Sequence, residues 1–248
     1  MTPLLRSEGL TVLGGGGEPI IEGVDLALHR GEIVAILGVN GSGKTTLVRA
    51  LAGLVEPSSG ELRLGDRTAV SARRHAAYLP QLARPVPWRD AIGNAALPLE
   101  ASGVDRRTAR KVAREALAST DPALMRRGGR RATGLSGGER QRLLLAGVLA
   151  IARPLVLLDE PLSAVDAVER RAAQDRLRQY ATSGRCVVLV THEPTEAARV
   201  ADRIVVLGGR PGRVVAERVP PPPARRDPEL QGLLAADLLG LLHEAAGA

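Results

Sequence analysis

Residues 38–45 read Gly-Val-Asn-Gly-Ser-Gly-Lys-Thr, and this stretch decides the fold. Its glycines allow consecutive backbone N–H groups to close around phosphate oxygens, because no Cβ atom is in the way. Lys44 supplies a compact positive charge for the outer phosphates, and the Thr45 hydroxyl is suited to bind Mg²⁺. The apolar run 32–37 predicts a strand, and the spacing of residues 45–52 predicts a helix whose positive end faces the phosphates. The pattern therefore predicts a nucleotide-binding loop between a strand and a helix.

The composition limits the classes of function. With 248 residues, the chain is long enough to bury a large core. Its net charge is +7, and because Lys44 and Lys111 are its only lysines, 34 basic residues minus these two leaves 32 arginines. The arginine pairs are dispersed and aromatic residues are few, so we expect solvated basic surfaces and no nucleic-acid partner. Such pairs occur at 73–74, 106–107, 126–127 and 130–131, among other places, and the aromatic residues are Tyr78, Trp88 and Tyr180.

Two further features concern the cellular compartment. No apolar run reaches the roughly 18 to 20 residues that cross a bilayer, and the N-terminus lacks a basic and then apolar signal segment. We therefore expect the protein to stay in the cytoplasm. Cys186 is the only cysteine and lies in the apolar run 186–190, so we expect a small buried hydrophobic side chain rather than a reactive thiol.

Strand-like and helical stretches alternate along the chain. This alternation predicts an α/β fold with a largely parallel central sheet. The strand-like runs are 61–64, 155–158, 187–190 and 204–207. From about residue 90 to 152 the spacing is helical, which predicts a helical lobe inserted into the α/β core.

The C-terminal region has a different composition. Four prolines at 220–223 predict an extended connector, and the leucine spacing of residues 228–246 predicts an amphipathic helix that packs back on the domain. We therefore predict one domain. Its parts are an α/β core at 1–84 and 153–219, a helical lobe at 85–152, and the proline connector with the C-terminal helix at 220–248.

A second motif, Leu-Ser-Gly-Gly-Glu, occupies residues 135–139. Ser136 and Glu139 have the spacing of a capping box, which starts a helix. A plain helix start does not explain Gly137 and Gly138, because each glycine lowers helix stability by roughly 1 kcal/mol. Bare N–H groups at this helix end predict a second site for an anion.

A third motif is an apolar strand that ends in two carboxylates, at residues 154–161. Because side chains alternate along a strand, Asp159 and Glu160 are expected to point to different sides. One would then act on Mg²⁺ through water, and the other would polarise an attacking water as a general base.

These three motifs, in this order, resemble the nucleotide-binding subunit of an ATP-binding cassette (ABC) transporter, and the resemblance covers nearly the whole chain. The glycine-rich loop and the Asp-Glu strand are shared by many ATPases, whereas the motif at 135–139 distinguishes this family. The resemblance implies an α/β, P-loop (RecA-like) nucleoside triphosphatase core with a mostly parallel sheet, an N-terminal antiparallel β portion and an inserted helical lobe.

The resemblance also assigns residues that are weak signals by themselves. Gln81 matches the glutamine that contacts Mg²⁺ and the attacking water, and His192 matches the histidine that holds the γ-phosphate. Residues 163–166 resemble the loop that bridges two subunits, with Val165 where leucine is commoner. The implied catalytic residues are Glu160, His192 and Gln81; the Mg²⁺ residues are Thr45, Gln81 and Asp159; the ATP contacts are Gly38, Asn40, Gly41, Ser42, Gly43, Lys44, Thr45, Thr46, Ser136, Gly137, Gly138 and Asp166.

Partners and cofactors follow from the same resemblance. It implies ATP hydrolysis with Mg²⁺, a homodimer that closes around two ATP, two integral membrane permease subunits and an extracytoplasmic solute-binding protein. The chain would lie peripherally on the inner face of the cell membrane. Residues 87–89, 92–95, 201–207 and 210–213 resemble the nitrate, sulfonate and taurine importer branch. Two alternatives stay open: a soluble ATPase of this superfamily that acts on a protein or nucleic-acid assembly, and an exporter subunit.

The chain departs from the family at the nucleotide base. Members usually have an aromatic residue upstream of the glycine-rich loop that stacks on adenine, but the first aromatic residue here is Tyr78. Leu13 and the glycines 14–17 occupy the corresponding region. Because stacking contributes roughly 1–3 kcal/mol per base, we predict weak discrimination among nucleotide bases.

Overall fold

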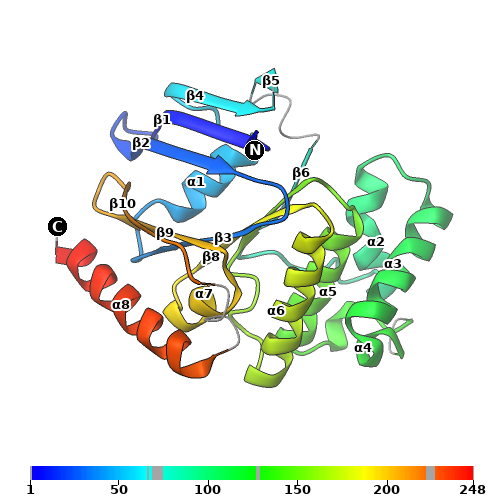
Figure 1. Cartoon of the computed structure of the whole chain (residues 1–248). Helices are drawn as coiled ribbons and strands as arrows, with labels where there is room; N and C mark the ends of the chain where they lie inside the picture. Colours follow the sequence, from blue (N-terminus) through cyan, green and yellow to red (C-terminus); the bar gives the residue numbers. More distant parts are fainter. Residues whose placement is uncertain (1, 66, 69–74, 127–128, 222–226, 248) are drawn as a thin grey trace.

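A computed structural model of the chain describes residues 2–65, 67–68, 75–126, 129–221 and 227–247. Arginines 73, 74 and 127, and prolines 222 and 223 of the expected connector, lie outside these ranges. In these ranges the strands form two sheets, and helices lie around and between them (Figure 1). Within the described ranges, no helix is both long and apolar enough to cross a membrane.

The central sheet has six strands in the order β10-β9-β3-β8-β7-β6. Five of them are parallel, and β10 pairs antiparallel with β9 at one edge. The strands β3, β7 and β8 are buried along their whole length, because both faces of a parallel sheet are covered. The strands are β3 (Ile33–Gly38), β6 (Ala76–Leu79), β7 (Leu155–Asp159), β8 (Cys186–Thr191), β9 (Arg203–Gly208) and β10 (Arg213–Arg218).

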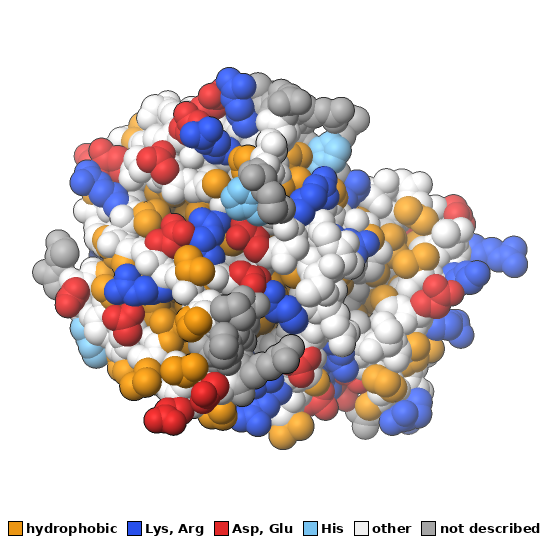
Figure 2. All heavy atoms as spheres, viewed as in Figure 1, with side chains coloured by type: hydrophobic (Ala, Val, Ile, Leu, Met, Phe, Trp, Pro, Cys, Tyr) orange, Lys and Arg blue, Asp and Glu red, His pale blue; other side chains and the backbone are white. Residues whose placement is uncertain are grey.

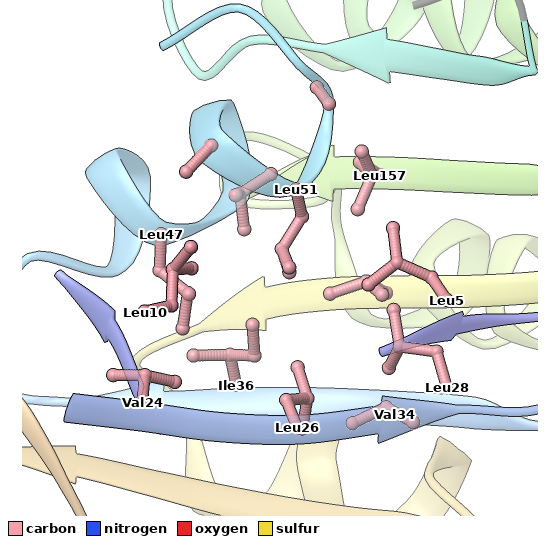
Figure 3. Packing of buried hydrophobic residues seen from close by; sticks show 14 of the residues in the cluster. Leu5, Leu10, Val24, Leu26, Leu28, Val34, Ile36, Leu47, Leu51 and Leu157 are labelled. Atoms are coloured by element: carbon pink, nitrogen blue, oxygen red, sulfur yellow. The ribbon is translucent and has the colours of Figure 1, made fainter. Parts of the chain in front are cut away.

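A smaller antiparallel sheet contains the N-terminal strands in the order β2-β1-β4-β5. The expected strand at 61–64 lies in this sheet, within β4, and not in the parallel sheet. Helix α1 lies between the two sheets, and its leucines pack against both (Figures 1 and 3). The elements are β1 (Leu5–Leu13), β2 (Pro19–Leu28), β4 (Ser59–Leu64), β5 (Arg67–Thr68) and α1 (Lys44–Leu51).

Helices lie side by side at one end of the molecule and have an apolar core of their own (Figure 1). This group carries the start of α5, which is the second motif of the sequence. Its elements are α2 (Ala91–Ala101), α3 (Arg106–Thr120), α4 (Pro122–Arg126), the 3₁₀ turn η2 (Ala132–Gly134) and α5 (Gly137–Ala150).

The remaining helices are α6 (Ala167–Thr182), α7 (Pro194–Val200) and α8 (Pro228–Gly247). Leu238 and Leu242 bury α8 against the sheet and α7, as the leucine spacing predicted. Figure 2 shows basic and acidic side chains interspersed over the visible face.

The two sheets confirm the predicted fold class, which has a mostly parallel sheet and an antiparallel N-terminal sheet.

Cys186 is fully buried in β8, as predicted. Burial raises the pKa of its thiol, so the reactive thiolate form is disfavoured.

Candidate functional site

The glycine-rich loop connects β3 to α1 in a conformation that only glycine fits without strain. Gly41 and Gly43 have φ angles of 84° and 82°, in the left-handed region. A Cβ atom at Gly43 would lie 2.5 Å from Cγ2 of Ile21, and one at Gly38 would lie 2.4 Å from the Leu207 carbonyl oxygen. Two neighbouring strands therefore press directly on the loop backbone.

Lys44 occupies the mouth of this loop. Its ammonium Nζ donates hydrogen bonds to the carbonyl oxygens of Gly38 and Val39, each at 2.8 Å. Burial lowers the pKa of Lys44, while the nearby carboxylates of Glu160 and Asp159 oppose that shift. The Lys44 ammonium is therefore bonded to carbonyl oxygens, and the phosphate oxygens of a nucleotide can replace them as acceptors.

Ser42 adds an unsatisfied polar group. Its hydroxyl is buried and has no hydrogen-bond partner among the residues that the structure describes. Such a group costs free energy unless a ligand or water binds it. Asn40 lies beside it in the loop, and Thr46 lies in the first turn of α1. The loop therefore has the glycine cradle, the cation and the free hydroxyl that fit a nucleotide's phosphates.

The first carboxylate, Asp159, lies at the end of β7 and faces α1. Its Oδ2 atom accepts hydrogen bonds from Oγ1 of Thr45 at 2.9 Å and from the hydroxyl of Tyr78 at 3.3 Å. Burial raises the pKa of Asp159, and these two hydrogen bonds oppose the shift. The Thr45 and Asp159 oxygens are hard ligands of the kind that Mg²⁺ takes together with phosphate oxygens. Sequence reasoning missed Tyr78 as a partner, although it lies three residues before Gln81.

The second carboxylate, Glu160, points away from Asp159, but strand alternation is not the reason. The strand ends at Asp159, and Glu160 has a left-handed φ of 48°. Its Oε2 accepts a hydrogen bond from Nε2 of Gln81 at 2.9 Å, and its Oε1 lies 3.2 Å from Nδ1 of His192. Three residues that are far apart in sequence therefore meet here.

The start of α5 forms the predicted capping box. The Ser136 backbone N–H donates to the Glu139 carboxylate at 2.8 Å, and the Glu139 N–H donates to the Ser136 hydroxyl at 3.2 Å. A Cβ atom at Gly138 would lie 3.1 Å from the Ala164 carbonyl oxygen. Close packing therefore accounts for Gly138 without an anion, whereas Gly137 has only ordinary contacts.

Gln141 joins this helix to the loop after β7, and sequence reasoning missed it. Its Nε2 donates to the Ser163 hydroxyl at 2.9 Å, and its Oε1 accepts from the Ala164 N–H at 2.8 Å. The Ser163 hydroxyl lies 3.3 Å from the Glu160 carbonyl oxygen, to which it donates. One chain of hydrogen bonds therefore connects the helix bearing Ser136 to the backbone of Glu160.

Asp166 ends this loop and caps α6. Its carboxylate accepts the N–H groups of Val168 and Glu169, each at 3.1 Å, and the bond from Glu169 leads in lowering the pKa of Asp166. This role is local. Within the described ranges, no hydrogen bond or ion pair connects Asp166 or Ser136 to the phosphate loop.

The region expected to hold the base is aliphatic. Leu13 at the end of β1 is 43% exposed, and Ile20 on β2 is 37% exposed. Ile20 lies next to Gly14, since a Cβ there would be 3.4 Å from the Ile20 side chain, and next to Gly43 of the phosphate loop. The region expected to hold the base therefore presents a small apolar surface without an aromatic ring.

Known proteins are similar to this chain in sequence and in fold. A family described as "ABC transporter" matches residues 21–163, which is more than half of the chain. The chain belongs to the ABC transporter family. It is 40% identical over 233 residues to an aliphatic sulfonates import ATP-binding protein, SsuB 1, of Rhizobium johnstonii, covering 91% of this chain and 82% of that protein. It is 38% identical over 208 residues to a taurine import ATP-binding protein, TauB, of Chromobacterium violaceum, covering 84% and 79%.

Solved structures of this ABC family have the same fold. The ATP-binding cassette MJ0796, solved as a dimer in a post-hydrolysis state with ADP and Pi, has a TM-score of 0.74 at 28% identity and covers 87% of this chain and 98% of its own. An ATP-binding subunit of an ABC transporter has a TM-score of 0.79 at 27% identity and covers 97% and 99%. This ABC protein is therefore an ATP-binding and ATP-hydrolysing subunit.

Proposed function

We propose that this subunit closes with a second copy around two ATP molecules and drives solute import through separate integral membrane subunits. The observation that carries the proposal is the division of the site within one protomer. The phosphate loop and both carboxylates lie together, whereas the side-chain bonds at the start of α5 join Ser136 to Glu139, and Gln141 farther along the helix joins it to residues 163–164. A helix start held apart in this way can complete the site of a partner related by two-fold symmetry.

The residues have distinct roles in this proposal. Gly38, the loop N–H groups and Lys44 bind the phosphates, and the Ser42 hydroxyl of the same loop, which has no partner among the described residues, is a further candidate donor. Mg²⁺, bound at Thr45 and Asp159 with Gln81 as the third predicted ligand, would neutralise charge on the phosphates. The Glu160 carboxylate accepts a proton from the attacking water, and Gln81 and His192 hold its two oxygens in place.

Paired closure is tested by the size of the protein in solution. The Glu160→Gln variant with ATP and Mg²⁺ should form dimers in multi-angle light scattering, because ATP stays uncleaved between the protomers. The same variant with ADP should stay monomeric. Monomers in both conditions, even with the membrane subunits present, would exclude the proposed closure.

A groove of about 440 Å³ supports a membrane partner. Its lining residues come from two segments, Arg84, Pro85 and Pro87 in the first and Ala132, Thr133 and Arg140 in the second. The first segment follows Gln81 and the second leads to Ser136, so a partner in this groove would contact both parts of the ATP site. The strongly exposed residues Leu82 and Trp88 lie close in sequence to the lining residues 84–87.

Co-purification tests this docking site. Thr133→Arg should fill the groove and reduce recovery of the two permease subunits, while Ser119→Arg on α3 should not. Equal recovery with both variants would place the contact elsewhere on the subunit. Stimulation of the ATPase by DNA would instead favour a soluble ATPase of this superfamily.

Because the relatives are named for sulfonate and taurine import, we assign the solute to that class. In this assignment an extracytoplasmic solute-binding protein delivers the solute to a complex at the inner membrane face. Loss of taurine or alkanesulfonate uptake in the Glu160→Gln strain tests this assignment.

A further inference from the structure

The turn between β9 and β10, residues 209–212, lies against the outer side of the phosphate loop. A Cβ atom at Gly212 would lie only 2.0 Å from the Ser42 carbonyl oxygen, so the two backbones are in direct contact. The Gly212 N–H donates to the Ile20 carbonyl at 2.9 Å, and the Glu22 N–H donates to the Gly212 carbonyl at 3.0 Å. Strand β2 therefore holds this turn in contact with the phosphate loop.

The Arg210 side chain extends from this turn onto the phosphate loop. Its Nη2 atom donates to the Asn40 carbonyl oxygen at 3.4 Å. The same nitrogen lies 2.6 Å from the position of a Cβ at Gly41, so the guanidinium covers the Asn40–Gly41 peptide. Any side chain larger than that of glycine at position 41 would displace it.

The direction of this hydrogen bond sets the direction of an N–H group. In a trans peptide, C=O and N–H point to opposite sides. Because the Asn40 carbonyl faces Arg210, the Gly41 N–H faces the inner side of the loop, and it has no acceptor among the residues that the structure describes. Lys44 bonds the two preceding carbonyls, of Gly38 and Val39. Two cations thus hold three successive carbonyls of one loop.

We propose that Arg210 is a positioning residue for triphosphate binding, which holds the Asn40–Gly41 peptide with its N–H turned toward the phosphates. Lys44 must turn its ammonium toward the incoming phosphates, whereas Arg210 stays on the outer side and keeps the loop in its binding conformation. The inference rests on the proposed phosphate site. It predicts a loss of affinity for the phosphate chain with no loss of turnover at saturation.

The test compares ATP with a probe that has no base. In the Glu160→Gln background, Arg210→Ala should raise the dissociation constants of Mg·ATP and Mg·tripolyphosphate by the same factor, about 3- to 10-fold, as for one hydrogen bond. In the otherwise unchanged enzyme, KM for ATP should rise by that factor while kcat stays constant. Calorimetric titration measures the first and steady-state ATPase assays measure the second.

The controls separate positioning from general destabilisation. Arg218→Ala removes the same charge from the far end of β10, where Arg218 pairs with Asp237, and should leave both constants unchanged. Arg210→Lys keeps a cationic donor and should recover most of the affinity; a lysine variant as weak as the alanine variant would contradict the proposal. Should the alanine variant not fold, Arg210→Gln takes its place.

Two further results would overturn the inference. One is unchanged tripolyphosphate binding in Arg210→Ala, and the other is a weakening for ATP alone, which would place Arg210 on the base or ribose. The Lys44→Ala variant distinguishes a wrong inference about Arg210 from a wrong assignment of the phosphate site. If Lys44→Ala loses tripolyphosphate while Arg210→Ala keeps it, the site stands and Arg210 has no positioning role; if Lys44→Ala keeps it, the phosphate site itself is wrong.

Discussion

Glu160 adopts a backbone conformation that is costly for a residue with a Cβ atom, about 1–3 kcal/mol. Its N–H donates to the Val190 carbonyl of the neighbouring strand at 3.1 Å, and its carboxylate is bonded to Gln81. These contacts hold the strained residue in place. The turn at Glu160 also separates the two carboxylates, which in the proposed function assigns Asp159 to Mg²⁺ and Glu160 to the attacking water.

Glu160→Gln should keep ATP binding and lower turnover by about 10²–10⁴-fold, because an amide cannot accept the proton from water. Single-turnover hydrolysis together with nucleotide titration measures both quantities. Since Gln is nearly the same size, the contacts to Gln81 and His192 can persist. Hydrolysis at the normal rate would exclude Glu160 as the general base.

Base selection should be weak, because Leu13 and Ile20 present an apolar surface without a ring to stack on the base. GTP should therefore compete with ATP at a similar inhibition constant in an ATPase assay. Leu13→Tyr should restore stacking and lower KM for ATP by roughly 5- to 100-fold. A strong preference of the unchanged protein for ATP would mean that other groups hold the base.

At the scale of elements, Asp90 joins two helices of the helical group. It caps α2 by accepting the Gly93 N–H at 2.6 Å, and it pairs with both terminal nitrogens of Arg110 on α3 at 3.0 and 2.7 Å. The hydrogen bonds from Arg110 lead in lowering the pKa of Asp90 below its usual value. A Cβ at position 93 would lie 2.7 Å from the same carboxylate, which explains the glycine there.

Asp90→Asn should keep the cap and lose the charge, lowering the free energy of unfolding by roughly 0.5–1 kcal/mol, whereas Asp90→Ala should lose about 1–2 kcal/mol. Because the folded pKa is depressed, this stabilisation is fully present above the unfolded value near pH 4 and is lost as pH falls through the folded pKa. Urea unfolding at several pH values measures it. A difference between Asp90→Asn and the unchanged protein that does not shrink as the pH falls below 4 would contradict this account.

The limits of sequence reasoning are also clearest among elements. Residues 38–45, 135–139 and 154–161 were identifiable because each motif is contiguous and its chemistry follows from its own residues. Contacts between segments were not, as Asn94 shows. Its buried side chain accepts the Val86 N–H at 2.6 Å and donates to the carbonyls of Val86, Arg89 and Asp90.

Other differences have similar causes. The strand β6 is only four residues long, too short for its pattern to stand out. The strand-like run at 61–64 was correct as a strand, but its pattern does not say which sheet it joins. The partners of Tyr78, Gln141 and Arg210 follow from the crossing of distant elements, and periodicity carries no information on such pairs.

At the scale of the whole molecule, Ser136 should act on a partner and not on its own protomer. Ser136→Arg places a large cation at the helix start and removes the hydroxyl of the capping box. ATP binding to the monomer should remain within about twofold, because Ser136 does not contact the phosphate loop, while ATP-driven dimers of the Glu160→Gln background should disappear. Light scattering and nucleotide titration of the double variant measure these two effects. Dimers that survive would remove Ser136 from the interface.

Trp88 is the only tryptophan of the chain, is 76% exposed and directly follows Pro87, which lines the same groove as Thr133. Its fluorescence therefore reports on that surface without background from any second indole. In the free subunit its emission should be that of a hydrated ring and should be readily quenched by iodide. Seating of a permease segment would shift the emission to shorter wavelength and protect it from the quencher, so the native protein carries its own optical probe of assembly.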